Sequence, residues 1–169
     1  ICQFIGYDNY GDEGKVMGLA PLGENTYAKF MRKIVQITDS GFTANLDYLS
    51  RFGTNQGFVI QNDGSVNLQP QYSNKMIEEL GPPRQRNSEI TQRDMDLACS
   101  LQHRFEEIYL HLIKSLSDLT PEKQVAIAGG CALNSVANGK IFRATPFTET
   151  CIQPAAGDDG LALGSALYA

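Results

Sequence analysis

The sequence lacks the features that mark several large classes of protein. No apolar run in its 169 residues approaches the roughly 18 that a membrane-spanning helix needs, so no embedding in a membrane is expected. Lysine and arginine form no block and the formal net charge is -5, which argues against a broad nucleic-acid-binding surface. The composition, 42% hydrophobic and 20% charged, instead predicts a folded chain with a real core.

Paired metal-ligand patterns are also missing. The two histidines, His103 and His111, have no partner at ligand spacing, so both are interpreted as structural, with His103 exposed. No CxxC pair occurs, which favours reduced, mostly buried thiols of a cytoplasmic protein and leaves disulfide pairing open. The cysteines are Cys2, Cys99, Cys131 and Cys151. Because the sequence starts at Ile1, inside an apolar stretch, we expect the chain to be a segment of a longer protein.

Periodicity in the first half predicts mixed elements. Residues 1–7 are expected to form a strand followed by an acidic loop, and residues 24–37 have the spacing of an amphipathic helix. The stretch 57–68 indicates a hairpin that turns at Asn62, Asp63 and Gly64.

The second half predicts a long helix and then an alternation of strands and helices. Thr91 and Asp94 are typical of a helix start, and the helix should end before Pro121. Its apolar face is expected to carry Ala98, Leu101, Phe105, Ile108 and Leu112. Beyond it we expect strand 124–128, helix 132–143, strand 149–152 and helix 159–168. This order predicts an α/β fold with a parallel or mixed sheet covered by helices.

Three loops share one design, in which an apolar segment leads through glycines and small or acidic residues into a helix. They are IGYDNYGDEGKVMGLAPLG (5–23), AIAGGCALNSVANGK (126–140) and CIQPAAGDDGLALG (151–164). In open α/β sheets, ligands bind where such loops gather, outside the carboxyl ends of the strands. The first loop does not match a P-loop, and GGCALN is not a dinucleotide-binding GxGxxG motif.

The middle loop predicts an anion site. A fully apolar strand, suggesting burial on both faces, leads into Gly129 and Gly130, where the backbone can turn tightly and be approached closely. A helix starting at about Ala132 would point its free N–H groups at a ligand above the glycines. Cys131 is interpreted as a small buried hydrophobe, because nothing near it in sequence would lower its pKa.

Each candidate polar residue also has a purely structural interpretation. Asp158 and Asp159 could simply cap a helix, and Asn134 could cap or pack locally. The cluster of Asp12, Glu13 and Lys15 could be a solvated group of charges. In the functional alternative, one aspartate binds a divalent cation that bridges to phosphate, because a carboxylate would otherwise repel that ligand.

Together the motifs resemble those of the O-carbamoyltransferase family, which includes nodulation-factor carbamoyltransferases and antibiotic-tailoring enzymes. GDEGKVMGLAPLG (11–23), AGGCALNSVANGK (128–140) and QPAAGDDGLALGSAL (153–167) occur in the family's order. Cys131 stands where the family commonly has valine, and Leu22 where tyrosine is common. The resemblance implies half of an actin-like ATPase fold, of the sugar kinase, Hsp70, actin and RNase H-like group. In this fold, helices flank a mixed sheet, and the hairpin belongs to an insertion.

The resemblance also assigns roles. Gly129, Gly130, Asn134 and Gly157 match the nucleotide-binding motifs, as do Asp12, Glu13 and Lys15 on the ribose and phosphate side, with Glu13 preferred over Asp12. Asp158 matches a catalytic aspartate that holds a metal. The implied cofactors are ATP, as carbamoyl adenylate, and a divalent metal, either Fe or Mg.

The implied reaction is transfer of a carbamoyl group from carbamoyl adenylate, made from carbamoyl phosphate and ATP, to the hydroxyl of a small-molecule acceptor in biosynthesis. Residues 1–169 would be a single segment, the second half of the transfer domain, and inactive alone. The first half, with paired metal-binding histidines, would lie upstream, and the adenylate-forming domain downstream. The alternatives are a sugar kinase or ATPase of the same fold and a non-catalytic nucleotide-binding domain.

Overall fold

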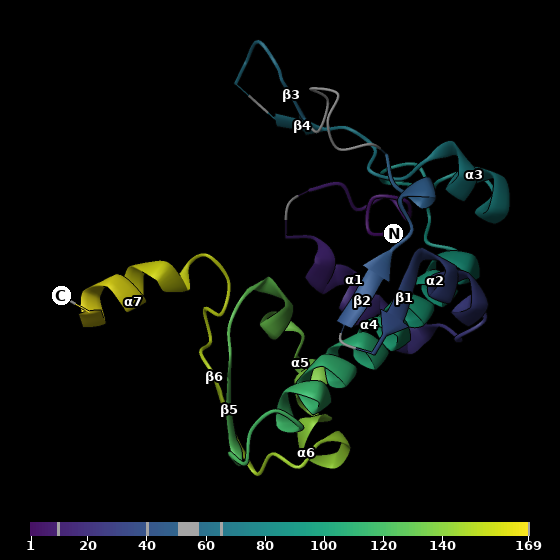
Figure 1. Ribbon diagram of the computed structural model, residues 1–169. Helices are drawn as coiled ribbons and strands as arrows, with labels where there is room; N and C mark the ends of the chain where they lie inside the picture. The colour runs from purple at the N-terminus through teal and green to yellow at the C-terminus, as the bar shows by residue number, and fades with distance from the viewer. Residues whose placement is uncertain (10, 40, 51–57, 65, 169) are drawn as a thin grey trace. The chain divides into compact units, whose positions relative to one another are not determined.

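The computed structural model describes residues 1–9, 11–39, 41–50, 58–64 and 66–168 and contains helices and short strands (Figure 1). It divides into two compact units, Ile1–Arg104 and Phe105–Ala169. The boundary falls within the longest helix, α4 (Gln92–Ser117), so each unit contains part of that helix. No described helix is long and apolar enough to cross a membrane.

The first unit combines short helices with two antiparallel strand pairs. Its helical elements before α4 are α1 (Glu13–Leu19), η1 (Ala20–Leu22), α2 (Ala28–Ile34), η2 (Leu46–Tyr48) and α3 (Asn74–Leu80). Its strands are β1 (Val35–Thr38), β2 (Gly41–Ala44), β3 (Phe58–Ile60) and β4 (Val66–Leu68). β1 pairs with β2, and β3 pairs with β4. The predicted hairpin is therefore confirmed, with Gly64 at φ 82° in its turn.

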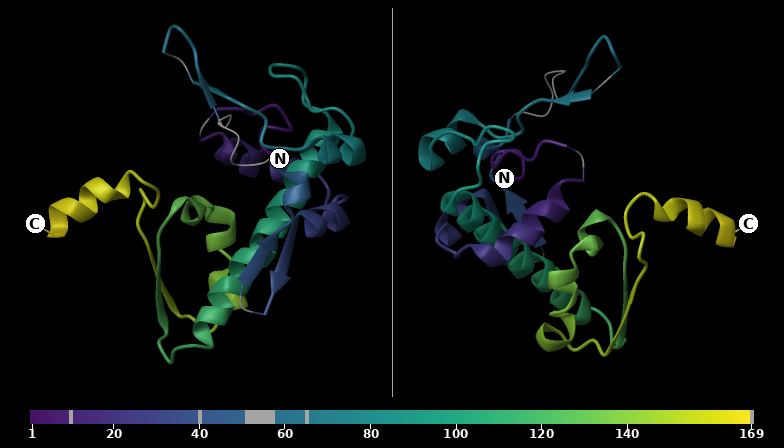
Figure 2. Two further views of the ribbon diagram at one scale, coloured as in Figure 1. Left: turned by 45° about the horizontal axis from the view of Figure 1, so that its top comes forward. Right: turned by 180° about the vertical axis from the view of Figure 1, so that it is seen from behind.

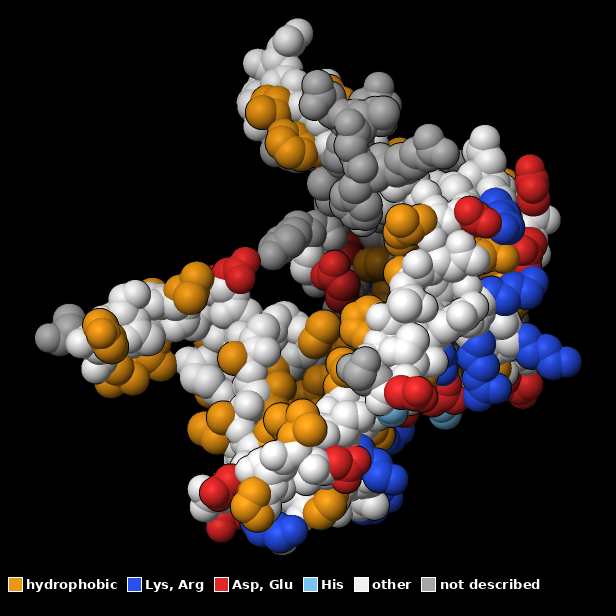
Figure 3. All heavy atoms as spheres, in the orientation of Figure 1, with side chains coloured by type: hydrophobic (Ala, Val, Ile, Leu, Met, Phe, Trp, Pro, Cys, Tyr) orange, Lys and Arg blue, Asp and Glu red, His pale blue; other side chains and the backbone are white. Residues whose placement is uncertain are grey.

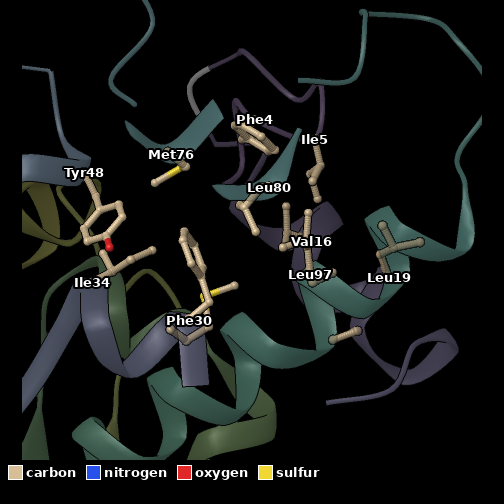
Figure 4. Packing of buried hydrophobic residues seen from close by; sticks show 13 residues of the cluster. Phe4, Ile5, Val16, Leu19, Phe30, Ile34, Tyr48, Met76, Leu80 and Leu97 are labelled. Atoms are coloured by element: carbon tan, nitrogen blue, oxygen red, sulfur yellow. The ribbon is translucent and has the colours of Figure 1, made fainter. Parts of the chain in front are cut away.

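The core of the first unit is built from the N-terminal segment and the helices around it. Phe4 and Ile5 are completely buried, as is Leu97 of α4. Figure 4 shows these side chains gathered with Phe30 of α2 and Met76 of α3. Burying a large apolar side chain stabilises a fold by about 1.5–3 kcal/mol, so this cluster fixes the arrangement of α1 to α4.

The predicted strand over residues 1–7 is wrong. This segment forms successive turns, in which the N–H of Ile5 donates to the carbonyl of Ile1 and the N–H of Tyr7 to that of Cys2, both at 3.0 Å. Arg84 bridges to the segment as well, because its Nε donates to the carbonyl of Ile5 at 2.7 Å. The apolar run is explained by burial in turns, and a short run of this kind cannot be assigned by composition.

The helix predicted over 24–37 is confirmed only in its middle, since α2 ends at Ile34. Val35, Ile37 and Thr38 are β-branched and continue as strand β1. The side chain of Arg104 donates two hydrogen bonds to the carbonyl of Val35, at 3.0 and 2.7 Å. These bonds satisfy the carbonyl of Val35 at the point where α2 ends and β1 begins.

The start of α4 is confirmed. Both the backbone N–H and the hydroxyl of Thr91 donate to Asp94 Oδ2, at 2.9 and 2.8 Å. The loop over 81–89 precedes it, as predicted, and the helix ends at Ser117, before Pro121.

The predicted apolar face of α4 is only partly right. Ala98 is buried, but Leu112 is 37% exposed, and Tyr109 and Ile113 are buried instead. The two ends of α4 contribute to different hydrophobic clusters, so the buried face shifts by one residue along the helix.

α4 also anchors the segment that follows η1. Asp96 accepts hydrogen bonds from the backbone N–H of Glu24 at 2.9 Å, from Gln92 Nε2 at 2.8 Å and from the hydroxyl of Thr26 at 3.4 Å. The bond from Glu24 is the largest cause that lowers the pKa of Asp96 below its usual 3.8. The folded state therefore favours the ionised carboxylate.

We expect the Asp96→Ala substitution to lower the melting temperature at pH 7 by a few degrees. A carboxyl with a lowered folded-state pKa adds stability above its unfolded pKa and loses it as the pH falls through the folded value. The difference from wild type should therefore narrow as the pH falls below about 4. Thermal melts between pH 7 and pH 3, with exposed Glu122→Ala as the control, test this. A difference that stays constant over the range would contradict it.

The second unit contains a parallel strand pair and short helices. Its elements after α4 are β5 (Gln124–Ile127), η3 (Gly130–Leu133), α5 (Ser135–Asn138), α6 (Ile141–Ala144), β6 (Glu149–Ile152) and α7 (Gly160–Tyr168). β5 and β6 run parallel and lie side by side in both views of Figure 2. The predicted strands and the predicted C-terminal helix are confirmed. A cluster of Tyr109, Ile113, Val125, Ala137, Ile141 and Phe147 forms the core of this unit.

Two predictions about this unit are wrong. The helix expected over 132–143 is broken into η3, α5 and α6, because Asn134, Gly139 and Lys140 interrupt it. β5 is not buried on both faces, since Val125 is buried whereas Ala126 is exposed. The residues of α7 beyond Gly160 that the structure describes are all exposed, and Figure 3 shows apolar side chains along this helix.

Candidate nucleotide-binding loops

The turn after β5 takes its shape from Gly129. This residue has φ 98°, a conformation that residues with a Cβ rarely adopt. Its N–H donates to the carbonyl of Ala156 at 2.7 Å. The bond joins the loop after β5 to the loop after β6, because these two parallel strands end at the same edge. Two of the three predicted loops therefore meet at the carboxyl ends of neighbouring strands.

Gly130 is exposed beside this turn. A Cβ placed on Gly130 would meet no described heavy atom within 4 Å, and the φ of this residue is outside the positive range. Its lack of a side chain is therefore required neither by backbone conformation nor by packing among the described residues. A glycine that the fold itself does not need is consistent with close approach of a ligand to the backbone.

Asn134 caps a short helix. Its side-chain oxygen accepts from the N–H of Ala137 at 3.0 Å, in the first turn of α5. The local capping interpretation is thus confirmed, and the helix expected from Ala132 begins at Ser135. Because α5 has only four residues, the anion site predicted at a helix N-terminus gains little from a helix dipole.

The loop after β6 places Gly157 and Asp158 beside the glycine turn. A Cβ on Gly157 would lie 3.7 Å from Leu133 Cδ1, which is ordinary packing contact with η3. Asp158 and Asp159 are both exposed just before α7, and the carbonyl of Asp158 accepts from the N–H of Leu161 at 3.1 Å. The carboxylates are therefore accessible to a ligand.

Sequence reasoning missed the role of Gly160. A Cβ there would lie 2.4 Å from the carbonyl oxygen of Ala155, closer than side chains approach backbone. Only glycine at position 160 lets the backbone of the loop bearing Asp158 approach the carbonyl of Ala155 this closely. The signal for this role in the sequence is the glycine that directly follows Asp158 and Asp159.

The acidic loop of the first unit holds Asp12 in place. Asp12 is only 5% exposed, accepts from the backbone N–H and the side-chain amide of Asn9, both at 3.1 Å, and pairs with Lys15 at 2.6 Å. The bond from Lys15 is the largest cause that lowers the pKa of Asp12, and the same bond raises the pKa of Lys15. Glu13 is exposed in the first turn of α1. The cluster is thus not simply solvated charge.

The predicted site residues fall into two groups. Gly129, Gly130, Asn134, Gly157 and Asp158 belong to the second unit, where bonds and packing join their loops. Asp12, Glu13 and Lys15 belong to the first unit. A site shared by the two groups stays a prediction.

The described residues do not form a metal site by themselves. Within them, no three His, Cys, Asp or Glu side chains gather into a set that could hold a metal ion. Asp158 therefore does not fit a metal using the side chains of these residues alone. Histidine ligands were predicted to come from outside this chain, so the metal stays a prediction.

None of the four cysteines, all of which the structure describes, forms a disulfide, and they are not mostly buried. Cys99 is buried, whereas Cys131 and Cys151 are exposed, so the prediction of a buried Cys131 is wrong. Cys131 lies in the 3-10 helix η3, where its side chain is exposed. Burial raises the pKa of Cys2 to about 11, which keeps that thiol protonated.

Comparison with known proteins identifies the family. The model described as "Carbamoyltransferase N-terminus" matches residues 1–167. The nodulation protein NolNO of Sinorhizobium fredii is 33% identical over 166 residues, covering 98% of this chain and 21% of that protein. The nodulation protein NolO of Bradyrhizobium diazoefficiens is 32% identical over 158 residues, covering 92% and 24%. An uncharacterized protein of Synechocystis is 35% identical over 167 residues, covering 97% and 25%.

The chain therefore belongs to the carbamoyltransferase family, as its motifs indicated. It spans about a quarter of the length of the curated relatives that it matches.

Proposed function

We propose that this chain is part of an ATP-dependent O-carbamoyltransferase that transfers a carbamoyl group from carbamoyl adenylate to an acceptor hydroxyl. The observation that carries the proposal is the family match over residues 1–167, which includes all three glycine-bearing loops. An actin-like fold, with this chain as its second half, belongs to the same proposal. The remaining domains would supply the adenylate.

The nucleotide would bind at the loops after β5 and β6. The turn at Gly129 exposes backbone at Gly130, where no described atom fills the space beside the Cα. Asn134 lies at the end of this turn, and Gly157 packs against η3 across from it. Small residues on both loops let backbone N–H groups approach phosphate oxygens directly.

Contacts to the ribose and phosphate side are assigned to Glu13 and Lys15. Both oxygens of Asp12 already accept hydrogen bonds or pair with Lys15 inside the first unit. Glu13 is exposed and therefore better placed to reach a ligand than Asp12. Lys15 is 58% exposed, so its ammonium can contact an anion while it stays near Asp12.

The transfer itself is an attack on an activated carbonyl. The acceptor oxygen forms a bond to the carbamoyl carbon, the hydroxyl gives its proton to solvent water, and the bond to the adenylate oxygen breaks as AMP leaves with the electron pair. The chain's contribution is to bind the nucleotide and hold the leaving phosphate in place. A metal, if bound, would polarise the carbonyl, but the described residues offer no complete ligand set for it.

We expect ATP to bind the intact protein in a metal-dependent manner, and the Asp158→Ala substitution to abolish that dependence. The matched control is Asp159→Ala, because the neighbouring carboxylate is also exposed. Calorimetric titration with ATP, with and without Mg²⁺ or Fe²⁺, measures this directly. Equal binding in wild type and the Asp158 variant would exclude Asp158 from the site.

The reaction products distinguish carbamoyl transfer from the alternatives. Forming an adenylate from ATP releases pyrophosphate and, after transfer, AMP, whereas a sugar kinase or ATPase releases ADP. The intact protein, incubated with ATP, carbamoyl phosphate and candidate acceptors, should produce AMP and pyrophosphate only when carbamoyl phosphate is present. ADP formation independent of carbamoyl phosphate would overturn the proposal.

A further inference from the structure

The side chain of Asn138 connects the glycine turn to α4. Asn138 is the last residue of α5, and its amide nitrogen donates to the carbonyl of Ala132 at 2.8 Å. Its amide oxygen accepts from the hydroxyl of Tyr109 at 2.8 Å. Because a backbone carbonyl can only accept, the contact with Ala132 determines which end of the amide faces Tyr109.

Tyr109 is a fixed anchor for this amide. Its side chain is 7% exposed and its ring stacks on Phe105, with centroids 5.4 Å apart and the planes at 19°. Burial raises the pKa of the Tyr109 hydroxyl, so the group stays protonated and can donate at neutral pH. The hydrogen bond thus starts from a buried side chain in the core of the second unit.

The turn is held at both of its ends. At one end, the N–H of Gly129 donates to the carbonyl of Ala156, and at the other, the carbonyl of Ala132 accepts from Asn138. Gly130 and Cys131, the residues between these two attachments, are exposed. The segment that faces solvent is therefore fixed by contacts behind it.

We propose that Asn138, held by the Tyr109 hydroxyl, is a positioning residue that keeps the turn from Gly129 to Leu133 in the shape that receives the nucleotide. This inference rests on the proposed function, because it concerns the same turn. It adds two residues, neither of which was identified as a site residue from the sequence. Both act through the backbone of the turn and not by touching the ligand.

A second contact from α4 supplies a matched control. Lys140, at the start of α6, pairs with Glu106, three residues before Tyr109 on α4. The ammonium of Lys140 donates a hydrogen bond to the Glu106 carboxylate, which is not part of the glycine turn. Substituting Lys140 therefore weakens the attachment of this region to α4 without removing either hydrogen bond of Asn138.

Hydrogen exchange in the intact protein without nucleotide tests the positioning directly. Tyr109→Phe keeps the stacked ring and removes one hydrogen bond, so exchange of the amides of residues 130–134 should accelerate about 2- to 10-fold. Asn138→Ala removes both bonds and should accelerate it further. Lys140→Met should leave exchange of these amides as in wild type.

ATP affinity, measured by calorimetry on the same variants, tests the consequence. Asn138→Ala should weaken ATP binding by roughly 10-fold, and Tyr109→Phe should weaken it by a smaller factor. Because Tyr109 acts through Asn138, Tyr109→Phe should have no further effect in the Asn138→Ala background. Lys140→Met should bind ATP as wild type does. A merely structural role would lower the melting temperature of these variants and leave their ATP affinity unchanged.

The outcomes separate this inference from the proposed function. If exchange accelerates but ATP affinity is unchanged, while Gly130→Leu still abolishes binding, the positioning role is overturned and the nucleotide site stands. If ATP does not bind wild type, or binds Gly130→Leu equally well, both are overturned. If Lys140→Met and Asn138→Ala lose ATP affinity equally, the loss reflects a general decrease in stability of this region. That result would also overturn the inference.

Discussion

Replacing Gly130 by leucine is expected to weaken ATP binding by at least roughly 100-fold, or about 2.8 kcal/mol, while leaving the fold intact. The two halves of this expectation have separate causes. The fold should tolerate the change, because a Cβ at Gly130 meets no described heavy atom within 4 Å and its φ is not positive. Binding should fail, because the new side chain fills the space beside the backbone that the phosphate would approach.

Calorimetric titration of the intact protein with ATP measures the effect, and circular dichroism and thermal melts report the fold. Gly41→Leu is the matched control, because a Cβ there also meets no described heavy atom within 4 Å and it lies outside the three loops. Gly129 would be a poor choice, since any residue with a Cβ is strained at φ 98°. ATP binding retained at wild-type strength in Gly130→Leu would refute the nucleotide site at this turn.

Replacing Gly23 by alanine is expected to destabilise the first unit by about 3 kcal/mol or more, because overpacking against a rigid backbone cannot relax cheaply. A Cβ at Gly23 would lie 2.1 Å from the carbonyl oxygen of Met95 on α4. The segment cannot move away easily, since Asp96 accepts from Glu24 and Ser100 accepts from the N–H of Tyr27 at 3.0 Å. The last glycine of the GDEGKVMGLAPLG motif thus has a packing role.

The matched control, Gly18→Ala, should change stability in the opposite direction. Gly18 lies within α1, and a Cβ there meets no described heavy atom within 4 Å. Alanine in a helix interior is more favourable than glycine by about 0.5–1 kcal/mol. Hydrogen exchange of the buried amides of α4 compares the two variants. Equal effects of the two substitutions would show that the close approach at Gly23 does not matter for stability.

Elements with strong local signals were predicted correctly. The 58–68 hairpin has a turn with glycine at positive φ, and α4 begins at a Thr91–Asp94 pair that forms the expected hydrogen bonds. The strands β5 and β6 and the helix α7 were also found at the predicted places. In each case, neighbouring residues provide the turn, the cap or the apolar run that makes the element recognisable in the sequence.

Elements whose conformation depends on distant contacts were predicted wrongly. Residues 1–7 form turns with hydrogen bonds from Arg84, far along the chain. The helix expected over 132–143 is broken into short pieces, and these pieces are tied to α4 by the Tyr109–Asn138 hydrogen bond and the Lys140–Glu106 pair. Helix propensity over such a short stretch is weak, and these tertiary contacts override it.

The candidate site also has residues that the sequence revealed and contacts that only the structure revealed. The resemblance to family motifs identified Gly129, Gly130, Gly157 and Asp158 from the sequence, although of these four residues only Gly129 has the positive φ that favours glycine. The sequence could not show that Asp12 is buried with Asn9 and Lys15, or that Gly160 lies against Ala155. Nor did it reveal the contribution of Tyr109, which lies on another helix.

The order of the residues alone thus reveals the family, the order of strands and helices in the last third of the chain, and the loops that carry the candidate site. Those features depend on residues close together in the chain, and local pattern is enough to specify them. Which groups of these loops form internal hydrogen bonds, and which remain accessible, follows only from the folded structure. That choice depends on partners far apart in sequence, such as Tyr109 with Asn138 and Gly129 with Ala156, which only packing brings together.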